Sequence, residues 1–296
     1  MYFPTAGIEC HPFIPFAAAL GISFVTSMGG ISGAFLLLPF QMSVLGYVNP
    51  SVSSTNQFFN VLACPSGVWR YWREGRMLWP LAFTVALGTL PGVFLGAFIR
   101  ITLLPDPASF QLFAGLLLLY MGLRMARLLW RERGRRPAPR PAGQNLSSCR
   151  VLAWNSRVLE FTFQDAHYSV STRKLALLSL AVGLVGGAYG IGGGAIMAPF
   201  LVACFGLPVH VVAGATLLAT WLTSLAGVGF YTLLAPFYPH LTVAPDWRMG
   251  LLVGLGGLCG VYLGARCQKH VPAFALKALL AAVLLFTALR YLGQGV

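Results

Sequence analysis

Charged residues make up only 9% of this 296-residue chain, whereas hydrophobic residues make up 57%. A soluble globular domain carries about 25% charged residues, because those side chains cover its water-facing surface. A chain with so few charges cannot cover such a surface, and its mean hydropathy of +0.75 agrees with this. The composition therefore excludes a soluble enzyme and predicts a polytopic membrane protein.

The charges that are present are mostly basic and are clustered. Lys and Arg number 20 against 7 Asp and Glu, and eleven of the 20 lie between Arg124 and Lys174, with three more between Arg70 and Arg76. Clusters of this kind mark the cytoplasmic side of a membrane protein. We therefore expect no nucleic-acid partner, and we expect membrane lipid around the spans and the 131–174 segment in the cytoplasm.

Ten apolar stretches are separated by glycine, proline or charge. A helix needs about 20 apolar residues to cross a bilayer, and six stretches are that long: 50–69, 77–99, 108–130, 209–234, 248–268 and 273–293. The other four form two pairs joined by glycine-rich turns, 13–28 with 31–47 and 175–189 with 192–207. We interpret each pair as a helical hairpin of two short arms, and the sequence leaves open whether the arms cross fully or re-enter.

The chain also contains an internal repeat. A shift of 160 residues aligns 29–40 with 189–200, and a shift of 168 aligns 87–97 with 255–265, where eight of eleven positions are identical. The second pair carries a glycine at every fourth position, which lets another helix approach closely. The chain is therefore predicted to consist of two homologous halves.

Each predicted half holds one hairpin and three spanning helices, an odd number of crossings. The halves should then be inverted relative to each other, as in many secondary transporters. We expect an all-α fold with a first transmembrane repeat at 1–130, a basic cytoplasmic linker at 131–174 and a second repeat at 175–296. Both termini are then predicted to lie outside, in the inner membrane of a bacterial cell.

The linker itself has two parts. Its first part, RERGRRPAPRPAG, is basic and rich in proline, which favours disorder or contact with anionic lipid. The residues that follow alternate in polarity around Asn155 and Ser156, which predicts a small β-hairpin. Its role is open between a scaffold, a lipid contact and a cytosolic gate.

The glycine-rich turns are the first candidates for ligand binding. No Asp or Glu lies within a predicted span, which argues against a proton antiporter based on carboxylates. Helix N-termini exposed by glycine offer backbone N–H groups and a positive dipole, which suit an anion. The candidates are Gly30, Ser32 and Gly33 in the first half and Gly190, Gly192, Gly193 and Gly194 in the second. The alternative is that these glycines only permit a tight turn and close packing.

Polar side chains inside apolar sequence are the second group of candidates. The helix after each hairpin carries them at matching positions: Asn56 and Asn60 in the first half, Thr216 and Thr220 in the second. Such groups are costly against lipid and should face the bundle interior. They can either donate to a ligand or form hydrogen bonds between helices.

Nothing in the sequence points to a cofactor or a metal. The six cysteines are scattered without the spacing of metal ligands, and we expect no catalytic residues. A membrane enzyme or assembly factor acting on a sulfur intermediate would need Cys64 or Cys204 as its reactive group. An anion channel is the other alternative.

The duplicated glycine-rich hairpins followed by Pro-Phe, the polar helices after them and the LGxxxGxxLGA helices resemble the TauE/SafE sulfite exporter family, also called the TSUP family. This resemblance covers about 250 residues. It implies transport of small sulfur-containing anions such as sulfite, sulfoacetate or thiosulfate. The first half departs from the usual glycine run at Ser32 and Ala34, so the two walls of the site are expected to differ. The oligomeric state does not follow from the sequence.

Overall fold

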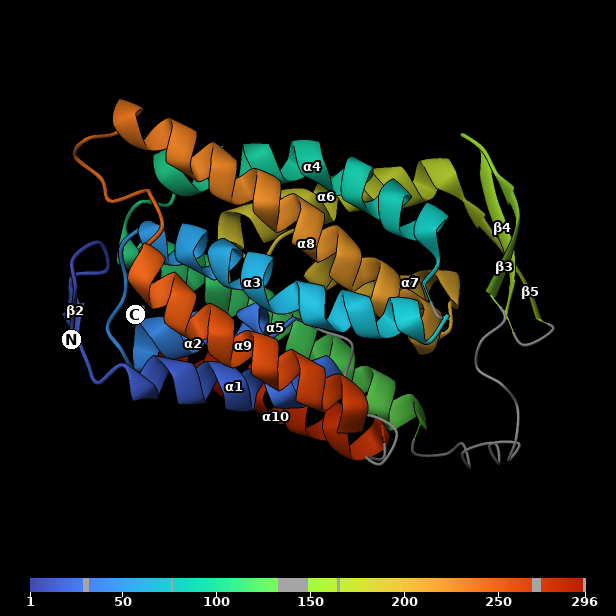
Figure 1. The fold of residues 1–296 in the computed structure, drawn as a ribbon, viewed down its shortest axis with the longest axis horizontal. Helices are drawn as coiled ribbons and strands as arrows, with labels where there is room; N and C mark the ends of the chain where they lie inside the picture. Colours follow the sequence, from blue (N-terminus) through green and yellow to red (C-terminus); the bar gives the residue numbers. More distant parts are fainter. Residues whose placement is uncertain (29–31, 76, 133–148, 164–165, 268–272, 295–296) are drawn as a thin grey trace.

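The computed structural model describes residues 1–28, 32–75, 77–132, 149–163, 166–267 and 273–294. Most of them are helical, and the helices run roughly along the long axis of the molecule (Figure 1). The helices are α1 (Phe13–Met28), α2 (Ala34–Ser43), α3 (Ser51–Arg73), α4 (Trp79–Thr102), α5 (Pro107–Glu132), α6 (Thr172–Tyr189), α7 (Gly194–Phe205), α8 (Val209–Leu234), the 3-10 helix η1 (Ala235–Phe237), α9 (Trp247–Cys267) and α10 (Ala273–Gln294).

The mostly helical fold is confirmed, but the chain is not all-α. The strands β1 (Tyr2–Phe3) and β2 (Ile8–Glu9) pair near the N-terminus, and a three-stranded antiparallel sheet is formed by β3 (Cys149–Trp154), β4 (Val158–Phe163) and β5 (Ala166–Ser171). The predicted turn at Asn155 is present, because its Oδ1 accepts hydrogen bonds from the N–H groups of Arg157 and Val158. The third strand, β5, was not predicted.

Four of the described helices are long and apolar enough to cross a membrane: Trp79–Thr102, Pro107–Arg131, Val211–Phe237 and Trp247–Cys267. Six spans were predicted. The helix α3 has 23 residues, but serine, threonine, asparagine and glutamine lower its hydropathy. These side chains are buried inside the bundle, so a polar helix is compatible with a membrane setting. Within α10, the apolar described part is Leu284–Gly293, which is shorter than a span.

Both predicted hairpins consist of two helical arms, α1 with α2 and α6 with α7. The second arms have 10 and 12 residues. At 1.5 Å per residue they reach about 15–18 Å, well short of the roughly 30 Å hydrocarbon core. Each hairpin therefore ends inside the bundle, where its turn can meet other helices.

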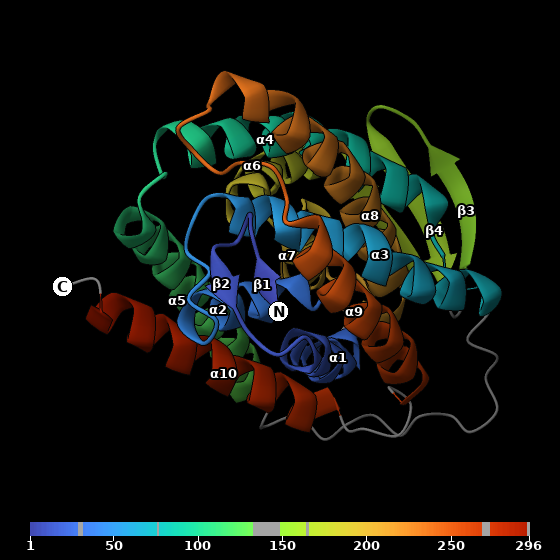
Figure 2. The same ribbon diagram turned by 60° about the vertical axis from the view of Figure 1, so that its left-hand side comes forward.

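The two halves interlock through their glycine-rich helices. In α4, a Cβ on Gly92 or Gly96 would collide with the backbone of α6, and in α9 a Cβ on Gly260 or Gly264 would collide with the backbone of α1. Both views show α4 beside α6 and α9 beside α1 (Figures 1 and 2). Each glycine-rich helix thus packs on the hairpin of the other half. The inverted orientation of the halves stays a prediction.

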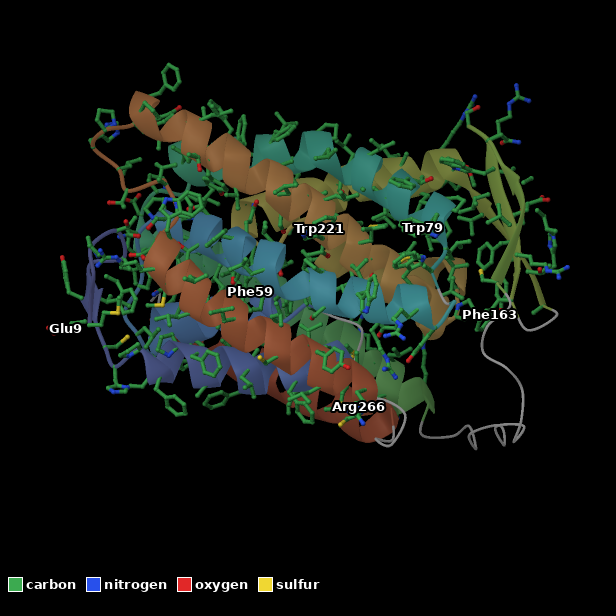
Figure 3. The ribbon with its side chains drawn as sticks, in the orientation of Figure 1. Glu9, Phe59, Trp79, Phe163, Trp221 and Arg266 are labelled. Carbon is green, nitrogen blue, oxygen red and sulfur yellow. The ribbon has the colours of Figure 1, made fainter. Side chains whose placement is uncertain are left out.

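The two ends of the bundle differ. The three-stranded sheet, which includes Phe163, lies at one end, with Trp79 near it and Arg266 toward the same end, while Glu9 and the N-terminus lie at the other (Figure 3). The sheet is attached to the bundle at Trp154, whose indole Nε1 donates to Thr84 Oγ1 of α4 at 3.3 Å. Phe59 and Trp221 lie between the ends.

Candidate functional site

Asn60 of α3 connects the turns of both hairpins. Its Oδ1 accepts a hydrogen bond from the Ser32 hydroxyl, in the first turn. Its Nδ2 donates to the carbonyl oxygen of Ile191, in the second turn, at 3.0 Å and to Ser224 Oγ of α8 at 3.2 Å. Asn60 is fully buried. These four residues, which we call the Asn60 junction, bring elements of both halves to one point inside the bundle.

Asn56 lies one helical turn before Asn60. Its Nδ2 donates to the carbonyl oxygen of Ala34 at 2.9 Å, at the start of α2. Its Oδ1 has no hydrogen-bond partner among the described residues. Asn56 therefore contacts the first hairpin with its donor and leaves an acceptor free in the interior.

Gln57, a further polar residue of α3, is also fully buried. Neither its Oε1 nor its Nε2 has a hydrogen-bond partner in the described part of the chain. The amide packs against Gly227 of α8, where any side chain would collide with it. A buried amide without partners costs about 1–3 kcal/mol, so Gln57 joins the candidates as a free donor and acceptor.

The threonines of α8 are buried but bond mainly to their own helix. Thr216 Oγ1 donates to Val212 O at 2.9 Å, and Thr220 Oγ1 donates to Thr216 O at 2.8 Å. Their hydroxyl protons are therefore occupied, as is common for threonine in a helix interior. In this conformation Thr216 and Thr220 offer acceptors rather than donors.

The glycines of the second turn each have a packing reason. Gly190 and Gly192 have φ angles of +89° and +71°, which side chains of L-residues rarely adopt. A Cβ on Gly193 would collide with Thr89 of α4, and one on Gly194 with the Thr216 carbonyl. Close packing thus accounts for glycine here, and the anion-binding role of these residues stays a prediction.

The backbone donors of the turns are only partly free. The N–H of Gly193 donates to Thr223 Oγ1 at 3.0 Å. In the first turn, Gly33 packs so closely on Ser23 of α1 and Phe59 of α3 that a Cβ would meet both. Gly30 lies outside the described residues. The site is therefore lined by side-chain amides and hydroxyls more than the sequence suggested.

Two charged residues are fully buried among those described. Asp246, in the loop before α9, accepts hydrogen bonds from the backbone of Met249 at 2.9 Å and of Ala6 at 3.1 Å. It thereby caps the N-terminus of α9. Arg100 of α4 is the other, and it was not among the residues that the sequence indicated as candidates.

The residues needed by the enzyme alternative do not form a catalytic cluster. Cys64 is buried with its Sγ 3.7 Å from Asn60 Oδ1, and Cys204 is exposed with its Sγ 3.2 Å from Arg124 Nη2. Arg124 also lies 4.1 Å from the centre of the Phe200 ring. No group of three or more His, Cys, Asp or Glu side chains comes together in the described parts of the chain.

Comparison with known proteins finds relatives named as membrane transporters. The chain is 27% identical over 261 residues to a probable membrane transporter protein of Xylella fastidiosa (strain 9a5c), covering 85% of this chain and 83% of that protein. It is 28% identical over 118 residues to the probable membrane transporter protein YdhB of Bacillus subtilis (strain 168), covering 40% of this chain and 45% of that protein. No solved structure matches.

The family model for sulfite exporter TauE/SafE matches residues 15–291, which include both hairpins, both glycine-rich helices and the Asn60 junction. This protein is an integral membrane protein, and it belongs to the TauE/SafE sulfite exporter family of membrane transporters.

Proposed function

We propose that this protein exports small sulfur-containing anions, such as sulfite, sulfoacetate, a related organosulfonate or thiosulfate, across the inner membrane of a bacterial cell. The substrate class follows the family. The transport mechanism that we propose is alternating access, with the substrate held near the middle of the bundle between the two hairpin turns.

The observation that carries this proposal is the Asn60 junction. A binding site formed between two structural repeats is where transporters with this kind of repeat hold their substrate. Around the junction lie the amide groups of Asn56, Asn60 and Gln57, and of their donors the Nε2 of Gln57 has no hydrogen-bond partner among the described residues. Sulfur oxyanions present only acceptor oxygens, so amide N–H groups are suitable donors for them.

The interlocked glycine-rich helices support a rearrangement of the bundle. Contacts made through backbone and small residues lack side chains that interdigitate deeply, so one helix can slide on the other with little steric resistance. The pairs α4 with α6 and α9 with α1 connect each hairpin to the opposite half. Sliding along these two contacts would therefore shift each hairpin relative to the opposite half on which it packs.

The direction of transport follows from charge. An inside-negative potential favours the exit of an anion by about 2.3 kcal/mol per charge per 100 mV. Export can then proceed without a coupling ion. This agrees with the described residues around the Asn60 junction, where no carboxylate lies to bind such an ion.

The test is sulfite and sulfoacetate flux from proteoliposomes that contain the purified protein. Asn60→Asp keeps the size of the side chain but places a negative charge between the turns, so we expect flux to fall by about tenfold or more, given the strength of like-charge repulsion in a low dielectric. Asn155→Asp is the matched control, because Asn155 lies in the turn between β3 and β4 and uses only its Oδ1, as an acceptor, which a carboxylate oxygen can replace.

The proposed site is refuted if Asn60→Asp folds, as judged by gel filtration and thermal melting, and transports like the control. The proposed substrate class is refuted if the wild-type protein moves none of the sulfur anions tested while it moves another solute.

A further inference from the structure

Arg100 is a buried cation whose charge is not neutralised by any described side chain. Its exposed fraction is 0%, and it is the only basic side chain among the buried residues that the structure describes. Within that same set, no carboxylate forms an ion pair with it. A buried charge without a counter-ion is strongly unfavourable, so its place in the interior calls for a reason.

The contacts of Arg100 fix its orientation without cancelling its charge. Its Nε donates to Ser53 Oγ at 3.3 Å, and its Nη1 donates to the carbonyl oxygen of Leu104. The guanidinium carbon lies 3.8 Å from the centre of the Phe110 ring. Its Nη2 has no hydrogen-bond partner among the described residues. Arg100 therefore holds a full positive charge and an unused donor in a fixed position.

This guanidinium lies beside the turn of the second hairpin. Gly96, one turn earlier in α4, packs on Ala188, near the C-terminal end of α6. Arg100 is about 6 Å farther along α4, which places it past the end of that arm. The Ser53 hydroxyl that accepts from Arg100 also lies 3.5 Å from the Ala188 carbonyl oxygen, to which it donates. A Cβ on Gly190 would lie 2.5 Å from the Cα of Ser53.

Arg100 also lies in line with the Asn60 junction. Ser53 and Asn60 are on the same helix, α3, seven residues or about 10 Å apart along its axis. Ser53 is on the side toward the N-terminal end of the bundle, where α3 begins (Figure 1). The hydroxyl of Tyr231 on α8 donates to Gly187 O at 3.2 Å, on the same arm of the second hairpin. A path from the junction toward this end of the bundle would therefore pass a fixed positive charge and the Ser53 hydroxyl that contacts it.

We propose that Arg100 and the Ser53 hydroxyl form a second anion subsite, which receives a small oxyanion after it leaves the Asn60 junction. A guanidinium suits this ligand because its planar N–H groups match the oxygens of a sulfonate or sulfite group. The subsite rests on the proposed function, since it requires an anion to move through the interior. Arg100 is closed from solvent in this structure, so the subsite opens when the hairpin turn and the end of α4 separate.

The experiment compares sulfite transport by Arg100→Gln, Arg100→Lys and Arg248→Gln in proteoliposomes, over a range of sulfite concentrations. Arg248 is exposed and lies at the same end of the bundle, at the start of α9, so Arg248→Gln removes one positive charge there without touching the subsite. Loss of a charge-assisted hydrogen bond should raise the KM of Arg100→Gln for sulfite about tenfold or more. Arg100→Lys, which keeps the charge but not the planar guanidinium, should recover only part of this loss, and Arg248→Gln should match the wild type.

A purely structural role for Arg100 gives a different result. It would lower the melting temperature and the maximal flux of Arg100→Gln while the KM of the remaining folded protein stayed unchanged, and this would overturn the subsite. If Arg100→Gln does not fold, Ser53→Ala and Arg100→Lys decide: a raised KM in Ser53→Ala at a wild-type melting temperature supports the subsite, and an unchanged KM in both variants overturns it.

Failure of the subsite and failure of the proposed function give separate results. If the wild-type protein transports sulfite and all Arg100 variants share its KM, only the subsite is wrong. If the wild-type protein neither transports sulfur anions nor is stabilised against heat by sulfite in detergent, the proposed function itself fails.

Discussion

Asn60 and Ile191 are 131 residues apart in the chain, and the amide of Asn60 donates a 3.0 Å hydrogen bond to the carbonyl oxygen of Ile191. This bond joins the polar helix of the first half to the hairpin turn of the second. Neither half can form the junction alone, because each supplies groups that the other orients. A change in the relative position of the halves would therefore lengthen or break this hydrogen bond.

Gln57 offers a test that separates binding from stability. Gln57→Leu replaces an amide without partners by an apolar side chain of similar size, so stability should stay the same or rise by about 1 kcal/mol. If the amide binds the anion, flux should fall by about tenfold, the value of one or two lost hydrogen bonds. Thermal melting in detergent and flux from proteoliposomes measure the two effects. Wild-type flux in the variant would remove Gln57 from the site.

The contact between α4 and α6 can be tested with a single methyl group. Gly96→Ala places a Cβ against the backbone of Leu184 and Ala188, and overpacking of this kind destabilises by about 1–3 kcal/mol. Gly229 of α8 has no heavy atom within 4 Å of the equivalent Cβ position, so Gly229→Ala should be neutral or stabilising, by up to about 1 kcal/mol. Melting temperatures of the two variants should therefore move apart. Equal melting temperatures would argue against the described packing.

The orientation in the membrane can be tested with a pair of cysteine variants in a background without other cysteines. Thr242 and Arg150 are both exposed, the first in the loop before α9 and the second on β3. In the predicted orientation, a membrane-impermeant maleimide added to spheroplasts labels Thr242→Cys directly. It should label Arg150→Cys only after the membrane is permeabilised. The reverse pattern would contradict the predicted topology.

The thiol of Cys149 on β3 should react slowly at neutral pH. Burial raises its pKa from 9.0 to about 11, because desolvation disfavours the thiolate, which is the reactive form. Since the folded pKa is the higher one, folding favours the protonated thiol, and this contribution to stability is present below pH 9 and is lost as the pH rises through about 11. Alkylation of a variant that retains only Cys149 should accelerate about tenfold per pH unit from pH 8 to 10.

The denatured form of the same variant is the control for this measurement. At pH 8 it should be alkylated about a hundredfold faster than the folded form, because a two-unit difference in pKa changes the thiolate fraction by that factor. Equal rates would mean that Cys149 is open to solvent.

The sequence predicted the features that local spacing determines. Asn56 and Asn60, four residues apart, predicted one polar helical face, and both do bond to hairpin residues. Glycines at every fourth position predicted a close helix contact, and Gly92 and Gly96 make one. A repeat in the sequence also predicted corresponding hairpins, and both are present.

Local spacing in the sequence does not indicate which distant helices pack against each other. A glycine-rich face does not indicate which helix will cover it, so the exchange of partners between the halves could not be foreseen. The free N–H predicted for Gly193 is taken by Thr223, thirty residues away. Arg100 was not among the candidate residues, because its burial depends on Ser53 and Phe110 from two other helices.

The packing of α1 on α9 has a consequence for biogenesis. More than 200 residues separate these helices, so α1 enters the membrane long before Gly256, Gly260 and Gly264 have been synthesised. Domains usually fold as they leave the ribosome, beginning at the N-terminus. Here α1 lies in the bilayer without α9 until the second half has been synthesised. A chain truncated before α9 would never supply this contact.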